Sequence, residues 1–284
     1  MKVIQAKSAG FCYGVQRAVE LAEQTARERG GCVMLGSIIH NAHVVQHLEQ
    51  LGAHQVAGPE EIHPGDTVLI RAHGEKKQVI GHLKDIGAEC VDATCPNVLR
   101  VQQIVAQADA EGRVPIIIGD PNHPEVMGVA SWSARSVVFE GAEALQRWLD
   151  EDPARRELPL TAVAQTTCIR IIWDGAAEIL KKQCTNAKIF DTICNATHKR
   201  QSEAAELASQ VDVMVVVGDR KSANTKHLTE ICSRQCPAVY QIERAEELKR
   251  DFLTGCSVAG LTAGASTPAG IIKEVYTTMS EEIK

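Results

Sequence analysis

The stretch DATCPNVLRVQQIVAQADAEGRVPIIIG, residues 92–119, decides the fold because it holds a thiol, a helix pattern and a buried strand in order. Cys95 closes a strand-like run that starts at residue 89, and residues 96–112 carry apolar side chains on one helical face. The strand VPIIIG then ends on Gly119, which follows Cys95 by 24 residues. The pattern predicts a strand, a helix and a second strand, with the cysteine where the first strand meets the helix.

The same interval occurs twice more in the chain. Cys12 precedes Gly36 by 24 residues, and Cys194 precedes Gly218 by 24 residues. Each interval again holds a helix pattern followed by an apolar strand. Self-similarity at a fixed spacing indicates a repeat architecture. We therefore interpret the chain as one unit repeated three times, with a thiol at the same place in each copy.

Strands that alternate with helices predict parallel sheets covered on both faces. We expect an α/β protein of three small α/β/α domains, related by pseudo-threefold repetition around a central metal site. The expected domains are residues 13–95, 96–193 and 194–284. In such sheets ligands collect outside the carboxyl ends of the strands. The unusual residues of this chain all fall at those ends.

Composition excludes several classes of protein. The chain has 284 residues, 44% of them apolar, with a net charge of −6 and a pI near 5.9. No stretch approaches the roughly 20 apolar residues of a membrane span, and mild acidity without a basic patch argues against nucleic acid. The sequence shows no basic, apolar leader. We expect a cytoplasmic protein with neither a nucleic-acid nor a membrane partner.

Ten cysteines without an export signal are expected to be reduced, so metal binding or catalysis is a better interpretation than disulfides. The three repeat thiols stand at helix N-termini, where backbone N–H groups and the helix dipole favour the thiolate that iron and zinc require. Three thiolates suit a 4Fe-4S cluster with one iron open, whereas structural zinc normally takes four protein ligands. The other cysteines are expected to be small buried residues, although Cys232 and Cys236, one helical turn apart, could together bind zinc.

Polar side chains follow the other strand ends. They are His40, Asn41, His73, His123, Glu125, Thr166, Thr167, Ser222, Asn224, Ser266 and Thr267. Imidazoles, hydroxyls and amides at helix N-termini suit a diphosphate held without a P-loop lysine. Ordinary helix capping is an alternative interpretation for these residues, including Glu125. Beside a metal and an anion, however, a lone carboxyl is a natural proton donor.

Motifs along the whole chain resemble those of the 4-hydroxy-3-methylbut-2-enyl diphosphate reductase (LytB) family of the non-mevalonate isoprenoid pathway. In order they are GFCYGV, HN after a strand, AHG, DATCP, NHPEV, AQTT, DTICNAT, KSAN and TAGAST. The resemblance implies three α/β domains around a 4Fe-4S cluster, with strand 1–12 packing back onto the third. It also implies an oxidoreductase that forms isopentenyl and dimethylallyl diphosphate by two-electron reductive dehydroxylation.

The resemblance further implies a role for each matching residue. Glu125 would protonate the departing oxygen, and Thr166 would orient the substrate hydroxyl beside it. The iron ligands would be Cys12, Cys95 and Cys194, and the diphosphate would be held by His40, His73, His123, Ser222, Asn224 and Ser266.

One position departs from the family pattern. Ala223 stands where relatives often have a second hydroxyl residue. The lost side-chain hydrogen bond implies a small loss of substrate affinity, about 0.5–1.5 kcal/mol.

The electrons are expected to come from outside the chain, because no dinucleotide-binding GxGxxG follows any strand. A small ferredoxin or flavodoxin would serve as the donor.

Two alternative functions stay open at this point. One is a lyase similar to quinolinate synthase, which also surrounds a three-cysteine cluster with three α/β units but needs no reductant. The other is a structural zinc protein or an electron carrier.

Overall fold

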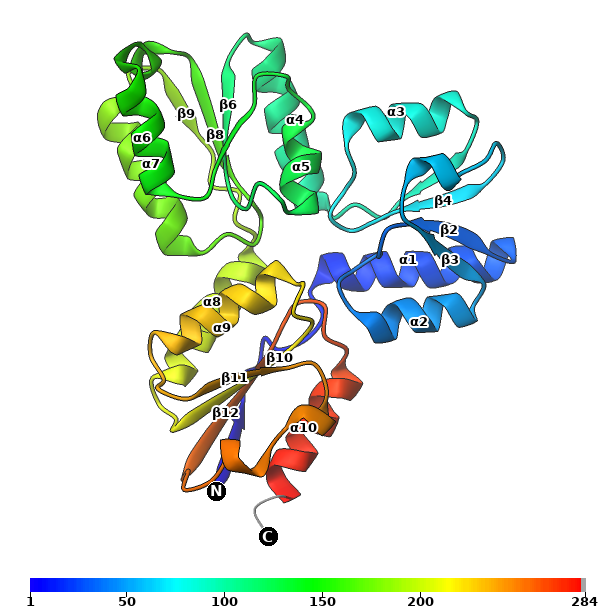
Figure 1. Cartoon of the computed structure of the whole chain (residues 1–284), viewed down its shortest axis with the longest axis vertical. Helices are drawn as coiled ribbons and strands as arrows, with labels where there is room; N and C mark the ends of the chain where they lie inside the picture. Colours follow the sequence, from blue (N-terminus) through cyan, green and yellow to red (C-terminus); the bar gives the residue numbers. More distant parts are fainter. Residues whose placement is uncertain (282–284) are drawn as a thin grey trace. The chain divides into compact units, whose positions relative to one another are not determined.

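The computed structural model describes residues 1–281, which form three four-stranded sheets (Figure 1). The chain divides into two compact units. The terminal unit comprises residues 1–16, 40–43 and 195–281. The central unit comprises residues 17–39 and 44–194. None of the helices formed by residues 1–281 is long and apolar enough to cross a membrane.

The central unit contains two of the sheets, and both are fully parallel. The strand order of the first sheet is β3(Ala53–Val56), β2(Cys32–Leu35), β4(Thr67–Ile70) and β5(Glu89–Asp92). The helices before and between these strands in the sequence are α1(Tyr13–Arg29), α2(Ala42–Gln50) and α3(Lys77–Asp85). The second has the order β7(Val137–Phe139), β6(Val114–Ile118), β8(Leu160–Ala164) and β9(Ala187–Ile189), with the helices α4(Pro96–Ala110), α5(Pro124–Ala130), α6(Ala142–Glu151) and α7(Arg170–Gln183).

The terminal unit contains the third parallel sheet. Its order is β11(Val239–Ile242), β10(Val213–Val217), β12(Val258–Ala263) and β1(Lys2–Gln5). The helices of this unit are α8(Asn195–Ala208), α9(Ala223–Ser233) and α10(Ala269–Glu281). The first strand of the chain therefore completes the last sheet, at the position that β5 and β9 occupy in the other two.

Equivalent hydrogen bonds recur in the three sheets. In each, a glycine just past the second strand of the order donates its N–H to the last carbonyl of the edge strand. The pairs are Gly36 and Val56 at 3.0 Å, Gly119 and Phe139 at 2.9 Å, and Gly218 and Ile242 at 2.9 Å. The 24-residue spacing in the sequence thus corresponds to one repeated backbone arrangement.

Alternation along the central strands places helices on both faces of the sheets. In β6, Ile116 and Ile118 pack in a cluster with residues of α6 and α7, whereas Ile117 packs with residues of α4 and α5. Successive side chains of a strand point to opposite faces, so each face receives its own apolar layer. In β10, Val215 packs with α10 and Val216 with α8 and α9. The α/β fold predicted from the sequence is confirmed, and α1, α4 and α8 begin directly after the three repeat cysteines.

Candidate active site at the strand ends

The three repeat cysteines have equivalent backbone surroundings. Each N–H donates to the carbonyl of the second residue past the end of the neighbouring strand. The pairs are Cys12 and Ala265 at 3.2 Å, Cys95 and Ala72 at 3.0 Å, and Cys194 and Thr166 at 3.0 Å. All three thiols are partly exposed. The repeat therefore fixes each cysteine at the carboxyl end of a sheet, immediately before a helix.

Short aspartate turns shape the loops that lead to two of these thiols. Oδ1 of Asp92 accepts a hydrogen bond from the Thr94 N–H at 2.9 Å, and Oδ1 of Asp191 accepts one from the Ile193 N–H at 3.2 Å. An aspartate that binds the backbone two residues on forms a compact turn from local sequence alone. This shared turn explains why the motifs DATC and DTIC both begin with an aspartate.

Most of the other cysteines lie in apolar surroundings that disfavour a thiolate. Burial raises the pKa of Cys32, and it raises the pKa of both Cys168 and Cys232 to about 12. Cys232 and Cys236 are buried in one apolar cluster, and within residues 1–281 no third metal-ligating side chain gathers with them. The structure therefore does not support a zinc ion bound by Cys232 and Cys236.

Glu125 and Thr166 meet at the ends of β6 and β8, which are paired strands. The Thr166 N–H donates to Oε1 of Glu125 at 2.6 Å, and the Thr166 hydroxyl donates to Oε2 at 2.8 Å. Glu125 lies in the first turn of α5, yet its carboxylate turns to Thr166 and is only 2% exposed. Its role is therefore not that of an ordinary helix cap.

Burial decides the protonation of Glu125. Loss of solvent raises the pKa of its carboxyl to about 7, against the lowering effect of the two hydrogen bonds from Thr166. A group with a pKa near neutral can both hold and release a proton at physiological pH. The arrangement suits a general acid.

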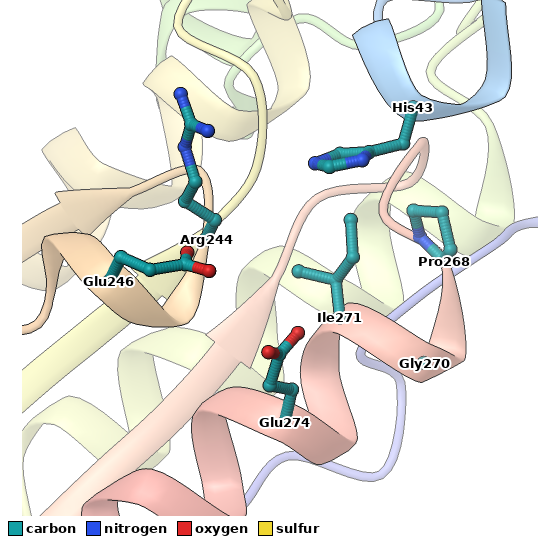
Figure 2. A pocket seen from close by; sticks show the side chains of 7 residues that line it. All are labelled: His43, Arg244, Glu246, Pro268, Gly270, Ile271 and Glu274. Carbon is teal, nitrogen blue, oxygen red and sulfur yellow. The ribbon is translucent and has the colours of Figure 1, made fainter. Parts of the chain in front are cut away.

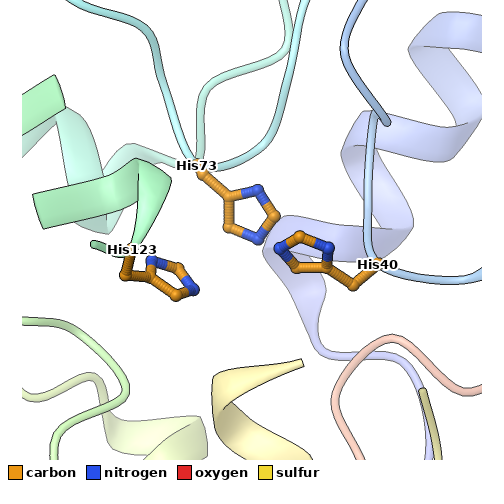
Figure 3. Close-up of side chains that lie close together, drawn as sticks. All are labelled: His40, His73 and His123. Carbon is orange, nitrogen blue, oxygen red and sulfur yellow. The ribbon is translucent and has the colours of Figure 1, made fainter. Parts of the chain in front are cut away.

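His123 caps α5 and lies beside a second imidazole. Its Nδ1 accepts a hydrogen bond from the Glu125 N–H at 3.1 Å. Since Nδ1 is the acceptor, the neutral ring carries its proton on Nε2. The ring of His73 meets it edge to face, with centroids 5.4 Å apart and planes at 86° (Figure 3). Figure 3 also labels His40, which belongs to the terminal unit.

The terminal unit carries the remaining predicted side chains. The Ser222 hydroxyl caps α9 by accepting a bond from the Thr225 N–H at 3.4 Å, and the Ser266 hydroxyl donates to the His40 carbonyl at 3.0 Å. Asn224 is 4% exposed, and neither its amide oxygen nor its amide nitrogen has a hydrogen-bond partner within residues 1–281. A buried amide without partners is costly. Asn224 is therefore well suited to bind a polar ligand.

The structure brings the predicted residues together in two sets. Glu125, Thr166, His73 and His123 lie in the central unit with Cys95 and Cys194, whereas His40, Ser222, Asn224 and Ser266 lie in the terminal unit with Cys12. The capping roles considered for His123 and Ser222 do occur.

Sequence reasoning assigned no role to Gln165, although it lies in the AQTT motif. This side chain is buried, and its Oε1 accepts a hydrogen bond from the Asp120 N–H at 3.1 Å. It thereby fixes the start of the loop that carries His123 and Glu125. The sequence signal that could have identified Gln165 is an amide side chain directly after an apolar strand and before a polar loop.

Two surface depressions involve none of the predicted side chains. One, of about 460 Å³ in the terminal unit, is lined by His43, Arg244, Glu246 and the start of α10 (Figure 2). The other, of about 220 Å³ in the central unit, is lined in part by Arg71 and Lys76. Neither contains a side chain that the sequence assigns to chemistry.

Known proteins resemble this chain over nearly its full length. The family model described as LytB protein matches residues 3–280. A 4-hydroxy-3-methylbut-2-enyl diphosphate reductase of Caldanaerobacter subterraneus subsp. tengcongensis is 40% identical over 280 residues, which are 97% of this chain and 95% of the relative. The enzyme of the same name from Nitratiruptor sp. is 38% identical over 276 residues, 97% of either chain.

Solved structures give the same result. One is a structure of (E)-4-hydroxy-3-methyl-but-2-enyl diphosphate reductase, described as the terminal enzyme of the non-mevalonate pathway. It is 37% identical with a TM-score of 0.70, covering 99% of this chain and 100% of the other. The E-1-hydroxy-2-methyl-but-2-enyl-4-diphosphate reductase of Plasmodium falciparum is 26% identical with a TM-score of 0.91, covering 97% and 87%.

Proposed function

This chain belongs to the LytB protein family, and we propose that it reduces 4-hydroxy-3-methylbut-2-enyl diphosphate. Two electrons and two protons are consumed. One proton leaves with the allylic hydroxyl as water, and the other, together with the two electrons, converts the remainder into isopentenyl or dimethylallyl diphosphate. The observation that carries the proposal is the buried Glu125 carboxyl held by Thr166, in a chain matched end to end by reductases of this name.

The iron–sulfur group of this reductase would be held by Cys12, Cys95 and Cys194. The donor set fits, because these thiols are partly exposed at equivalent helix starts, whereas burial raises the pKa of thiols such as Cys168 and Cys232. We assign the group as one 4Fe-4S cluster with three cysteine ligands and an open fourth iron. Bound there, it would supply electrons and a Lewis-acid position for the substrate hydroxyl.

Glu125 would act as the acid that protonates the departing oxygen. Its pKa of about 7 leaves a large protonated fraction at neutral pH. Thr166 holds the carboxyl in one orientation through two hydrogen bonds, and its hydroxyl can also orient the substrate hydroxyl. In this proposal both residues act directly on the bond that breaks.

The diphosphate would be bound by neutral donors and helix ends. In the central unit, His123 presents Nε2–H and His73 adds a second imidazole. In the terminal unit, Asn224 has a buried amide without a protein partner in residues 1–281, and it lies in the first turn of the 11-residue α9. A helix N-terminus favours anions. His40, Ser222 and Ser266 complete the proposed set.

The electron donor would be a separate protein. Plant-type ferredoxin centres lie at about −400 mV, so a ferredoxin or a flavodoxin is suitable. We place the reaction in the cytoplasm.

The test is turnover by anaerobically reconstituted protein. Protein with 4-hydroxy-3-methylbut-2-enyl diphosphate and a chemical reductant is expected to form both C5 products, identified by mass spectrometry. The same mixture without reductant is expected to form neither, which separates a reductase from a lyase. Reconstituted protein that stays colourless, without visible absorption, would hold no iron–sulfur cluster and would refute the proposal.

A further inference from the structure

The loop between β1 and Cys12 is held by two charged side chains of α8. Arg200 donates to the Ser8 carbonyl from Nε at 3.0 Å and from Nη2 at 2.7 Å, and Nη2 also donates to the Gly10 carbonyl at 2.7 Å. Glu203 accepts the Lys7 N–H at 2.7 Å and the Ser8 N–H at 2.8 Å, together with the Ser8 hydroxyl. The cation binds carbonyls and the anion binds N–H groups of one loop.

This loop has one backbone turn, in which the Ala9 N–H donates to the Ala6 carbonyl at 3.3 Å, but it lacks the aspartate turn that shapes its two counterparts. Asp92 and Asp191 each form an aspartate turn shortly before a thiol. Six residues separate β1 from Cys12, whereas two separate β5 from Cys95, and none of the six is an aspartate. The clamp from α8 therefore replaces a support that the other two loops make for themselves.

Burial strengthens the bonds that Arg200 makes in this clamp. Arg200 is only 3% exposed, so its bonds to Ser8 and Gly10 are made largely out of water. Charge-assisted bonds of a guanidinium are stronger and more directional than bonds between neutral groups. Gly10 adopts φ +105°, a conformation that side chains other than glycine rarely allow, and it lies within the clamped segment.

We infer that Arg200 and Glu203 are positioning residues that fix Cys12 for cluster binding. Cys12 follows Gly10 closely, and its own N–H donates to Ala265. Because α8 begins immediately after Cys194, one helix starts at one thiol and holds the loop of another. The inference rests on the proposed function, since it takes Cys12 as a cluster ligand.

The first experiment needs no cluster. Hydrogen exchange of residues 7–12 is measured in metal-free protein carrying Arg200→Met, and the alkylation rate of Cys12 is compared with that of Cys95. We expect exchange to be about tenfold faster or more in this segment and Cys12 to react faster, with Cys95 unchanged. Unchanged exchange of residues 7–12 would overturn the inference.

The matched control is Arg113→Met. Arg113 is also buried and binds Thr161, Leu160 and Asn186, but these bonds lie at the amino ends of β8 and β9, away from the thiols. The control is expected to lose stability without changing exchange in residues 7–12. An equal effect of both variants on that segment would reduce Arg200 to a general structural role and overturn the inference.

The second experiment uses reconstituted protein and measures iron loss to a chelator together with the electron paramagnetic resonance spectrum after reduction. Outer partners of metal ligands typically alter affinity by about 10- to 100-fold, so Arg200→Met is expected to lose iron about tenfold faster with an altered spectrum. Glu203→Gln should show a smaller change, and Arg200→Lys a partial rescue, because lysine lacks the guanidinium fork.

The two experiments separate the inference from the proposed function. Wild-type protein that binds no cluster would refute the proposed function, whatever exchange shows. Wild-type protein that binds a cluster, with Arg200→Met unchanged in spectrum and iron loss, would overturn the inference alone. If Arg200→Met does not fold, Arg200→Lys and Glu203→Gln carry the same comparisons, and wild-type values in both would count against it.

Discussion

The Glu125 carboxylate accepts both the N–H and the hydroxyl of Thr166, at 2.6 and 2.8 Å. The carbonyl of the same threonine accepts the Cys194 N–H at 3.0 Å. One residue at the end of β8 thus connects the proposed proton donor to a proposed metal ligand. Pairing of β6 with β8 brings the two strand ends together, so the site is a direct product of the sheet.

Glu125→Gln is expected to lower turnover by about 100-fold or more, because an amide cannot supply the proton. Substrate binding should be preserved, since the substitution keeps the side chain's size. The measurement is single-turnover product formation alongside substrate affinity. Glu178→Gln, at an exposed ion pair with Lys182, serves as the control and should react as the wild type does. Parental turnover by Glu125→Gln would place the proton donor elsewhere.

The pH dependence of kcat/KM should report the Glu125 carboxyl. The acid must be protonated, so kcat/KM is expected to fall as pH rises through about 7. The Thr166 hydroxyl lowers this pKa, hence Thr166→Val should move the alkaline limb to higher pH while also reducing turnover. Thr161→Val, at the other end of β8, should leave the limb in place. A limb that stays fixed or moves down in Thr166→Val would contradict this assignment.

Protein stability should fall with rising pH because of the same group. The folded pKa of about 7 exceeds the ordinary 4.5, so the folded state binds more protons between these values and the free energy of unfolding falls across that window. The full burial cost, on the order of 3 kcal/mol, is present above pH 7. The stability of metal-free Glu125→Gln relative to the wild type, measured by denaturant unfolding, should therefore increase as pH rises from 4.5 to 8. A constant difference would show that the carboxyl is not desolvated.

Gly119→Ala is expected to destabilise the loop that carries His123. A Cβ at this position would lie 2.7 Å from Gln165 Cβ and 3.0 Å from Val126 Cγ2. Overpacking of this kind costs about 1–3 kcal/mol, measured as the denaturation midpoint of metal-free protein. The control is Gly81→Ala in α3, where a Cβ meets nothing within 4 Å and helix propensity favours alanine. A midpoint for Gly119→Ala at or above that of the wild type would disprove the close packing.

Local patterns in the sequence were sufficient for the order of strand, thiol and helix. Hydrophobic periodicity is a local property, so α4 could be predicted from its own residues and from Pro96 at its start. The pairing of β1 with β12 joins residues 2–5 to 258–261. Hydrophobic periodicity does not show which strand pairs with β1. Only the family resemblance indicated that the first strand packs against the third domain.

The same limit applied within the site. Strand-end position identified Glu125 and Thr166 as candidates, but their mutual hydrogen bonds depend on the register of β6 against β8. The role of Arg200 could not be predicted from the sequence for another reason. A charged residue in a helix pattern is normally assigned to the solvated face, and only the fold shows that it is buried against a loop 190 residues away in sequence.

The most direct measurement of the central claim is iron and acid-labile sulfide content after each of the ten cysteines is replaced singly by alanine. After anaerobic reconstitution, the variants at Cys12, Cys95 and Cys194 should fail to retain a full cluster, and those at the other positions should retain it. A full cluster in any of these three variants, or its loss on replacing a buried thiol such as Cys232 without loss of folding, would contradict the assignment.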